Sequence, residues 1–125
     1  MRVHISLPAR DISRSRAFYS TLFNQPPSKE KPDYLNFRLD EPAIHLSLIQ
    51  SESVPQRTSE HFGIELPSED EFKAWEQRLI HALPELAERE PGAQCCYARA
   101  DKVWLSDPDG NRWEIWHRKG EHSSL

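Results

Sequence analysis

This chain of 125 residues has few cysteines, no excess of positive charge and no long apolar run. Its two cysteines are adjacent, which excludes the disulfide framework of a small secreted protein. Lys and Arg number 16 against 20 Asp and Glu, so the net charge of −4 argues against a surface for nucleic acid or anionic membrane. No apolar run approaches membrane length, and Met1–Ser6 contains no apolar signal core. These absences predict a cytoplasmic protein that binds neither nucleic acid nor membrane.

The adjacent thiols of Cys95 and Cys96 are the most unusual feature that is present. Their Cα atoms are about 3.8 Å apart, closer than the roughly 4.4–6.8 Å of unstrained disulfides. Successive side chains of a strand point to opposite faces, so both sulfurs can face one target only where the backbone leaves the strand. Pro91-Gly92-Ala93 just upstream predicts such a loop. The pair suits a soft, thiophilic centre; the alternative is one small buried apolar residue beside an incidental one.

Apolar periodicity divides the first part of the chain into four elements and a linker. Val3, Ile5 and Leu7 alternate with polar residues, which predicts a strand. The further elements are a helix over Asp11–Phe23, strands over Tyr34–Leu39 and Ala43–Gln50, and a polar linker over residues 51–59.

The same pattern begins again at about residue 60. Ser68-Glu69-Asp70-Glu71 forms a capping box that opens a helix, and Pro84 closes it. Asp107-Pro108-Asp109-Gly110-Asn111 is a strong turn between the last two strands. The predicted strands of this half cover Phe62–Leu66, Leu86–Glu90, Cys95–Ala98, Val103–Ser106 and Trp113–His117, and a polar tail follows over residues 119–125.

An offset of 57 residues takes His4 to His61 and places strand on strand and helix face on helix face. This internal repeat predicts a single α+β domain of two βαβββ modules, over residues 1–50 and 60–118, related by a pseudo-two-fold. The modules are expected to form a curved mixed sheet around a metal cleft.

His4 and His61 each lie on the strand face opposite the apolar residues, so both imidazoles are expected to point into that cleft. Glu114 adds a carboxylate on the last strand, between large apolar residues. Two histidines and one carboxylate are the ligands of a facial triad that leaves coordination positions open. The alternative is an open sheet, in which these histidines face solvent and form no site.

The residues that carry a resemblance to a known family are His4, His61-Phe62-Gly63-Ile64, the Asp107–Gly110 turn and Trp113-Glu114. On these residues the chain resembles the vicinal oxygen chelate superfamily, which includes glyoxalase I, extradiol dioxygenases and fosfomycin-resistance proteins. The resemblance runs from Val3 to His117. Within it, the run Cys95-Cys96-Tyr97-Ala98-Arg99 is similar to one narrower branch, the carbon–arsenic lyases (organoarsenical demethylases) and the cadmium-induced proteins.

The resemblance implies a specific chemistry. His4, His61 and Glu114 would hold a divalent metal, Fe(II) in the lyases. Cys95 and Cys96 would bind a trivalent organoarsenical, such as methylarsenite, through two sulfur–arsenic bonds. Dioxygen activated at the iron would then cleave the carbon–arsenic bond and release arsenite.

Tyr97 and Lys102 are candidate catalytic residues at the border of the arsenical pocket; otherwise Tyr97 is a core aromatic residue and Lys102 a solvated strand end. Members of the superfamily often dimerise, so a homodimer is expected.

His45 departs from the pattern of the lyase branch. It is expected to be the first-half mate of Glu114, and the residue that resembles it in glyoxalase I is a fourth, acidic metal ligand. A fourth ligand would favour Lewis-acid chemistry, whereas a non-ligand His45 would be a polar residue of the cleft. Two alternatives to the lyase therefore remain: a glyoxalase-like lyase or isomerase with a redox-silent metal, and a non-catalytic cadmium- or metalloid-binding protein.

Overall fold

The structure is a computed structural model that describes residues 1–56, 60–95 and 98–121; residues 57–59, 96–97 and 122–125 lie outside it, as do the side chains of residues 93–95, 98–99 and 120–121. The chain forms two compact units. Unit 1 comprises Met1–Thr58 with Asp107–Gly110, and unit 2 comprises Ser59–Ser106 with Asn111–Leu125. Each contains one βαβββ module and is described by itself, and the predicted repeat is confirmed.

Unit 1 contains β1 (Val3–Ala9), α1 (Ile12–Phe23), β2 (Lys29–Lys31), β3 (Tyr34–Leu39) and β4 (Ile44–Gln50). Its sheet has the order β1-β4-β3-β2, in which β1 and β4 are parallel and the other pairs antiparallel. Strand β2 was not predicted, because its three residues are all charged and exposed and show no apolar alternation.

Unit 2 contains β5 (His61–Glu65), α2 (Glu69–Ala82), β6 (Glu88–Cys95), β7 (Ala98–Ser106) and β8 (Arg112–Glu121). The order β5-β8-β7-β6 repeats that of unit 1, again with one parallel pair, β5 and β8. The hydrogen bonds therefore form two mixed four-stranded sheets, one in each module, where one curved sheet was expected.

The region before the two cysteines differs from the prediction. Pro91 and Gly92 form no separate loop but a bulge within β6, where the register with β7 shifts between Glu90 and Ala93. Gly92 has a φ of +63°, which favours glycine, and its N–H donates to Asp101 Oδ1 at 2.8 Å. The predicted strand over residues 95–98 is wrong, because Cys95 ends β6 and Ala98 begins β7. In addition, β8 extends into the predicted tail as far as Glu121.

Both helices begin at side-chain caps that the sequence supplies. The Asp11 carboxylate accepts from the N–H of Ser13 at 3.0 Å and of Arg14 at 3.2 Å, and so caps α1. Ser68 Oγ accepts from the Glu71 N–H at 3.1 Å, so Ser68 caps α2 as predicted, but the Glu71 carboxylate accepts from the Ser68 hydroxyl at 3.2 Å and not from the backbone N–H of a full capping box. Neither helix of the described chain is long and apolar enough to cross a membrane.

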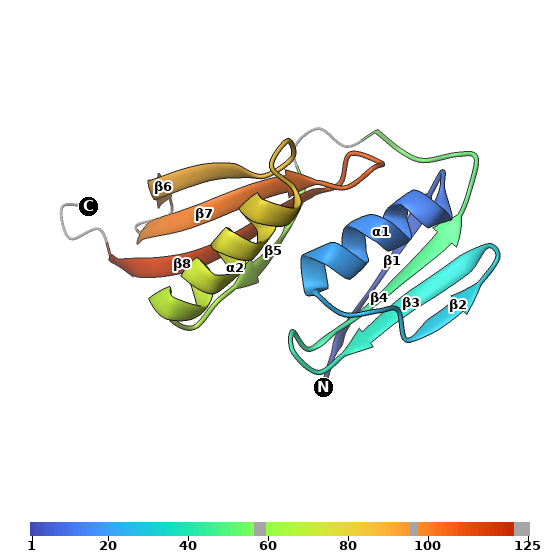
Figure 1. Cartoon of the computed structure of the whole chain (residues 1–125), viewed down its shortest axis with the longest axis horizontal. Coiled ribbons are helices and arrows are strands. Elements are labelled where there is room, and N and C mark those ends of the chain that lie inside the picture. The colour runs from blue at the N-terminus through green and yellow to red at the C-terminus, as the bar shows by residue number, and fades with distance from the viewer. Residues whose placement is uncertain (57–59, 96–97, 122–125) are drawn as a thin grey trace. The chain divides into compact units, whose positions relative to one another are not determined.

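Each helix covers one face of its own sheet (Figure 1). In unit 1, Phe18, Tyr19 and Leu22 of α1 are buried with the apolar residues of β3 and β4. In unit 2, Phe72 and Leu79 of α2 are buried with the apolar residues of β7 and β8. Burial of each large apolar side chain contributes about 1.5–3 kcal/mol. The helices thus occupy the apolar faces, and the opposite face of each sheet is left to polar side chains.

Candidate metal centre

In unit 2, the polar face of the sheet brings His61 and Glu114 together. His61 Nε2 lies 3.4 Å from Glu114 Oε1. The carboxylate is nearly buried, with 9% of its side chain exposed, whereas the His61 side chain is 44% exposed. An imidazole and a carboxylate at this distance present two of the ligand types that a divalent metal takes in proteins.

Glycine at position 63 makes room for the Glu114 side chain. Gly63 and Glu114 are cross-strand partners on β5 and β8. A Cβ atom at position 63 would lie 2.9 Å from Glu114 Cγ, a distance that real Cβ atoms essentially never show, and 3.1 Å from Glu114 Oε1, which is a tight contact. The carboxylate therefore lies over the backbone of β5, beside His61, only because residue 63 has no side chain.

Lys102 neutralises the Glu114 carboxylate. Its Nζ donates to Glu114 Oε2 at 2.9 Å, and only 14% of the Lys102 side chain is exposed. The ammonium also lies 5.4 Å from the ring centre of Trp104 and 5.7 Å from that of Trp116. Lys102 is therefore not a solvated strand end. It binds Oε2 of Glu114, and the other carboxylate oxygen, Oε1, lies beside His61. We call His61, Glu114 and Lys102 the Glu114 cluster.

Trp104 forms a wall of the same site, a role that was not predicted from the sequence. The His61 ring meets Trp104 edge to face at 5.2 Å, and the Arg112 guanidinium lies 4.3 Å from the Trp104 ring centre. Alternation along β7 was the available signal, because Lys102 and Trp104 are two residues apart and so share the polar face.

In unit 1, the polar face carries an analogous group around Ser47. Ser47 Oγ lies 3.2 Å from His4 Nε2 and 3.2 Å from the Tyr34 hydroxyl. Asn36 Nδ2 donates to the same Tyr34 hydroxyl at 2.9 Å. The hydrogen bond with Ser47, followed by that with Asn36, lowers the pKa of Tyr34 below its ordinary value of 10.0. We call His4, Ser47 and Tyr34 the Ser47 cluster; only His4 was predicted.

His45 is the direct neighbour of His4. The two are cross-strand partners, and their rings stack with centres 4.0 Å apart and planes 10° apart. His45 Nε2 lies 3.4 Å from Ser47 Oγ. Burial, then the positive charges of His4, Arg38 and Arg2, lowers the pKa of His45, so its neutral form is favoured.

The strand registers revise the expected equivalence of His45 and Glu114. His4 pairs with His45 and Ser6 with Ser47, whereas His61 pairs with Arg112 and Gly63 with Glu114. Counted from the two equivalent histidines, the unit 1 position that matches Glu114 is therefore Ser47, and His45 matches Arg112. The β3 and β7 registers extend the match, since Tyr34 and Lys102 then occupy equivalent positions. The Ser47 and Glu114 clusters are thus the same three positions of the repeat.

The predicted ligands are accordingly brought together in part. His61 and Glu114 meet in unit 2, and His4 meets His45 in unit 1. Within the part of the chain that the structure describes, no three His, Cys, Asp or Glu side chains gather as a metal site. The triad of His4, His61 and Glu114 stays a prediction. Cys96 and Tyr97 lie outside the described residues, and of Cys95 only the backbone, at the end of β6, is described.

The chain combines two βαβββ modules that each have a histidine on the first strand, and Glu114 adds a carboxylate on the last strand of the second module. The chain belongs to the glyoxalase/bleomycin resistance protein/dioxygenase superfamily, whose sequence profile matches residues 2–115. Proteins of this superfamily are generally metal-dependent.

Two relatives place the chain within the superfamily. It is 38% identical over 116 residues to a trivalent organoarsenical cleaving enzyme of Bacillus sp. (strain MD1), covering 93% of this chain and 72% of that protein. It is also 38% identical over 115 residues to the cadmium-induced protein CadI of Mycobacterium tuberculosis (strain H37Rv), covering 92% of this chain and 74% of that protein. The first relative is named for the cleavage of trivalent organoarsenicals and the second for its induction by cadmium.

A solved structure matches the fold. The glyoxalase/bleomycin resistance protein/dioxygenase from Alicyclobacillus acidocaldarius superposes with a TM-score of 0.76 at 19% identity, covering 96% of this chain and 92% of that one. The fold expected from the sequence, two βαβββ modules of the glyoxalase type, is therefore confirmed.

Proposed function

We propose that this protein is an Fe(II)-dependent lyase that cleaves the carbon–arsenic bond of trivalent organoarsenicals. The observation that carries the proposal is the buried Glu114 carboxylate beside His61, in a chain that also has an adjacent thiol pair and relatives named for organoarsenical cleavage. The metal requires imidazole and carboxylate ligands, and the substrate requires thiols.

The residues that would hold the metal are His4, His61 and Glu114. The cradle at Gly63 supports this assignment, because it keeps a carboxylate beside an imidazole where any other residue would displace it. When bound, Fe(II) would supply dioxygen activation at its open coordination positions. Lys102 holds Oε2 of Glu114, which leaves Oε1 as the oxygen for the metal.

Cys95 and Cys96 would capture the substrate. Each thiol condenses with one hydroxyl on trivalent arsenic, forms one sulfur–arsenic bond and releases one water. Arsenic is soft and prefers the two sulfur donors, whereas the metal prefers the harder imidazole and carboxylate ligands. Substrate and metal are therefore bound by different residues. One methylarsenite and one dioxygen then balance to one arsenite and one formaldehyde: the carbon–arsenic bond breaks, carbon is oxidised and dioxygen is reduced.

The decisive experiment separates capture from cleavage. Protein loaded anaerobically with Fe(II) is mixed with methylarsenite and then with dioxygen, and oxygen consumption and arsenite release are followed. Cys95→Ser and Cys96→Ser should each lose methylarsenite binding, measured by tryptophan emission, and keep Fe(II). Glu114→Gln should show the reverse, with binding kept and Fe(II) lost. Unchanged methylarsenite affinity in both cysteine variants contradicts the proposal.

A glyoxalase-like lyase or isomerase is the second candidate, and the stacking of His45 on His4 favours it. If His45 is a fourth ligand, His45→Asn will lose metal, and an isomerase activity of the wild type will vanish with it. Under the lyase proposal, the variant keeps roughly the wild-type Fe(II) content and still demethylates. Metal analysis after anaerobic dialysis decides between the two.

The name of CadI favours a third candidate, a protein that sequesters cadmium or a metalloid without turnover. Stoichiometric cadmium binding through the thiols, together with no oxygen consumption on methylarsenite, would establish it. We also expect the protein to be cytoplasmic and homodimeric. Sedimentation velocity at micromolar protein would test the oligomeric state, and a monomer under these conditions would contradict the expected dimer.

A further inference from the structure

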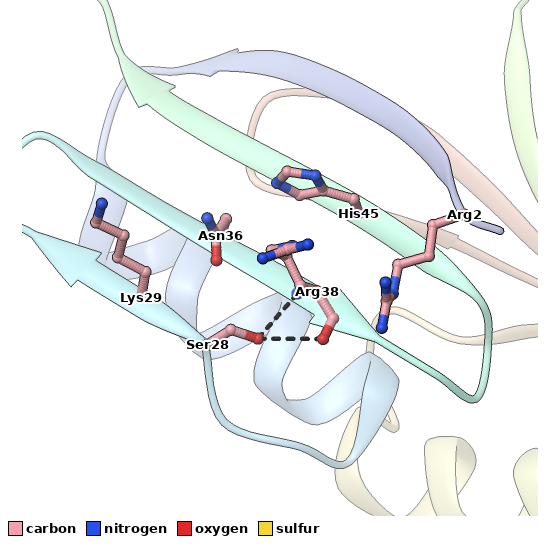
Figure 2. A pocket seen from close by; sticks show the side chains of 6 residues that line it. All are labelled: Arg2, Ser28, Lys29, Asn36, Arg38 and His45. Atoms are coloured by element: carbon pink, nitrogen blue, oxygen red, sulfur yellow. Dashed lines mark hydrogen bonds between the residues drawn. The ribbon is translucent and has the colours of Figure 1, made fainter.

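The polar face of the unit 1 sheet contains a pocket of about 630 Å³. Six residues line it: Arg2, Ser28, Lys29, Asn36, Arg38 and His45 (Figure 2). They come from the start of the chain, from Ser28 just before β2, and from β2, β3 and β4, and α1 lies on the far side of the sheet in the same view. The pocket adjoins the Ser47 cluster through His45 but contains none of its members.

Strand register explains why these side chains converge. Arg38 pairs with His45 across β3 and β4, and Asn36 pairs with Lys29 across β3 and β2. Cross-strand partners share a face of the sheet. Ser28 fixes the edge of the pocket, because its hydroxyl accepts from the Arg38 N–H at 2.9 Å.

The lining is cationic. Three of its residues are Arg or Lys, and no described residue that lines it is acidic. Arg2 already binds the Leu39 carbonyl at 2.8 Å and the exposed Asp40 carboxylate at 2.6 Å. Among the described residues, Arg38 and Lys29 have no ion-pair partner. Two cations thus remain for an anion from solution.

A second, independent observation concerns Asn36. It is only 6% exposed, and its Nδ2 donates to the Tyr34 hydroxyl. Its Oδ1 is buried and has no hydrogen-bond partner in the described structure. A buried acceptor without a donor costs stability, and a bound ligand commonly supplies what is missing. A ligand that matches both features carries an anionic charge and a donor proton.

We propose that this pocket binds a protonated tetrahedral oxyanion, of which hydrogen phosphate, hydrogen arsenate and a phosphonate are examples. Arg38 and Lys29 bind its oxygens, and its remaining O–H donates to Asn36 Oδ1. The pocket exceeds the size of such a group, so the oxyanion can also be part of a larger molecule. Of the predicted metal ligands, only His45, the possible fourth, lines this pocket, and the proposal does not depend on the proposed lyase activity.

Calorimetric titration of the metal-free protein with inorganic phosphate tests the proposal. Sulfate has the same shape and charge as hydrogen phosphate but no proton to donate, so it should bind at least about 10-fold more weakly. Arg38→Gln and Lys29→Gln should each weaken phosphate binding by about 10-fold or more. Lys31→Gln is the matched control, since Lys31 lies on the same strand and does not line the pocket.

Asn36→Ala tests the hydrogen bond from the proton of the oxyanion, because it removes the acceptor Oδ1. It should remove the preference for phosphate over sulfate, while thermal unfolding shows that the variant is folded. Methylphosphonate that binds as tightly as phosphate identifies an oxyanion carried by a larger molecule, and exclusive binding of phosphate identifies the free ion. No phosphate binding at millimolar concentration, equal binding of sulfate by the wild type, or equal losses in Lys29→Gln and Lys31→Gln would overturn the proposal.

Discussion

The two modules of this protein place the same three positions together and fill them differently. The Ser47 cluster has a neutral hydroxyl at its centre, within 3.2 Å of an imidazole and of a phenol. The Glu114 cluster has a carboxylate at the equivalent position, 3.4 Å from an imidazole and 2.9 Å from an ammonium. One scaffold therefore supports a hydrogen-bond network centred on a neutral hydroxyl in one copy and a network centred on a carboxylate in the other.

This difference assigns distinct tasks to the modules. A serine hydroxyl is neutral, whereas a carboxylate is an anionic ligand suited to divalent metals. A carboxylate that is 9% exposed also needs a partner, and Lys102 supplies it. Unit 2 therefore combines an anionic ligand type with its own counter-charge, whereas the equivalent position of unit 1 offers a neutral hydroxyl.

The largest expected effect comes from making the Glu114 cluster as neutral as its counterpart. Glu114→Gln keeps the shape of the side chain but removes its charge, so we expect Fe(II) binding and turnover to be lost. The loss should exceed the roughly 100-fold that removal of an outer-shell partner typically costs. Metal analysis after anaerobic dialysis measures it. Glu65→Gln, at the exposed end of β5, is the control; stoichiometric Fe(II) in Glu114→Gln would refute the ligand assignment.

Gly63 and Ser6 are equivalent positions, and only the first must lack a side chain. In Gly63→Ala the added Cβ would meet Glu114 Cγ at 2.9 Å, so the carboxylate must move away from His61. We expect metal affinity to fall by about 10- to 100-fold, as when the support of a ligand is lost. Ser6→Ala should leave affinity unchanged, because that position already carries a Cβ. Equal affinities in the two variants would show that the cradle is unimportant.

Lys102 and Tyr34 also occupy equivalent positions. Lys102→Met keeps the stem of the side chain and removes its charge, which leaves Glu114 without a partner and free to rotate. We expect metal affinity or turnover to fall by about 10-fold. Tyr34→Phe, the same change in the other module, should leave both unaffected because Ser47 is not a ligand. A loss in Tyr34→Phe as large as that in Lys102→Met would break the distinction between the clusters.

Much of the fold could be predicted from the sequence, because periodicity and caps are local signals. The strand and helix patterns whose repetition relates His4 to His61, and the N-cap at Ser68, are each recognisable from neighbouring residues. Two elements were missed for the same reason: β2 has no apolar alternation, and the bulge at Gly92 resembles a loop in sequence.

The site was less predictable, because it depends on register. A shift of two residues between parallel strands leaves the pattern of alternation unchanged, yet it decides whether His45 or Ser47 matches Glu114. The partnership of Lys102 with Glu114 likewise joins two strands and has no signature along the chain. The predicted residues were largely those with unusual chemistry, whereas Ser47, Tyr34 and Asn36 are common residues that become informative only in contact.

The smallest expected effect concerns the Ser47 cluster alone. Hydrogen bonds from Ser47 and Asn36 lower the pKa of Tyr34 below 10.0, and the unfolded chain lacks them. The folded state therefore favours the phenolate, and the resulting stability is fully present above the unfolded pKa and is lost as pH falls through the folded pKa. The free energy of unfolding of the wild type, relative to Tyr34→Phe, should rise as pH increases toward 10, and it should be flat near neutrality. Denaturant titrations of both proteins across this range measure the difference; a difference that falls with increasing pH would show that the cluster favours the neutral phenol.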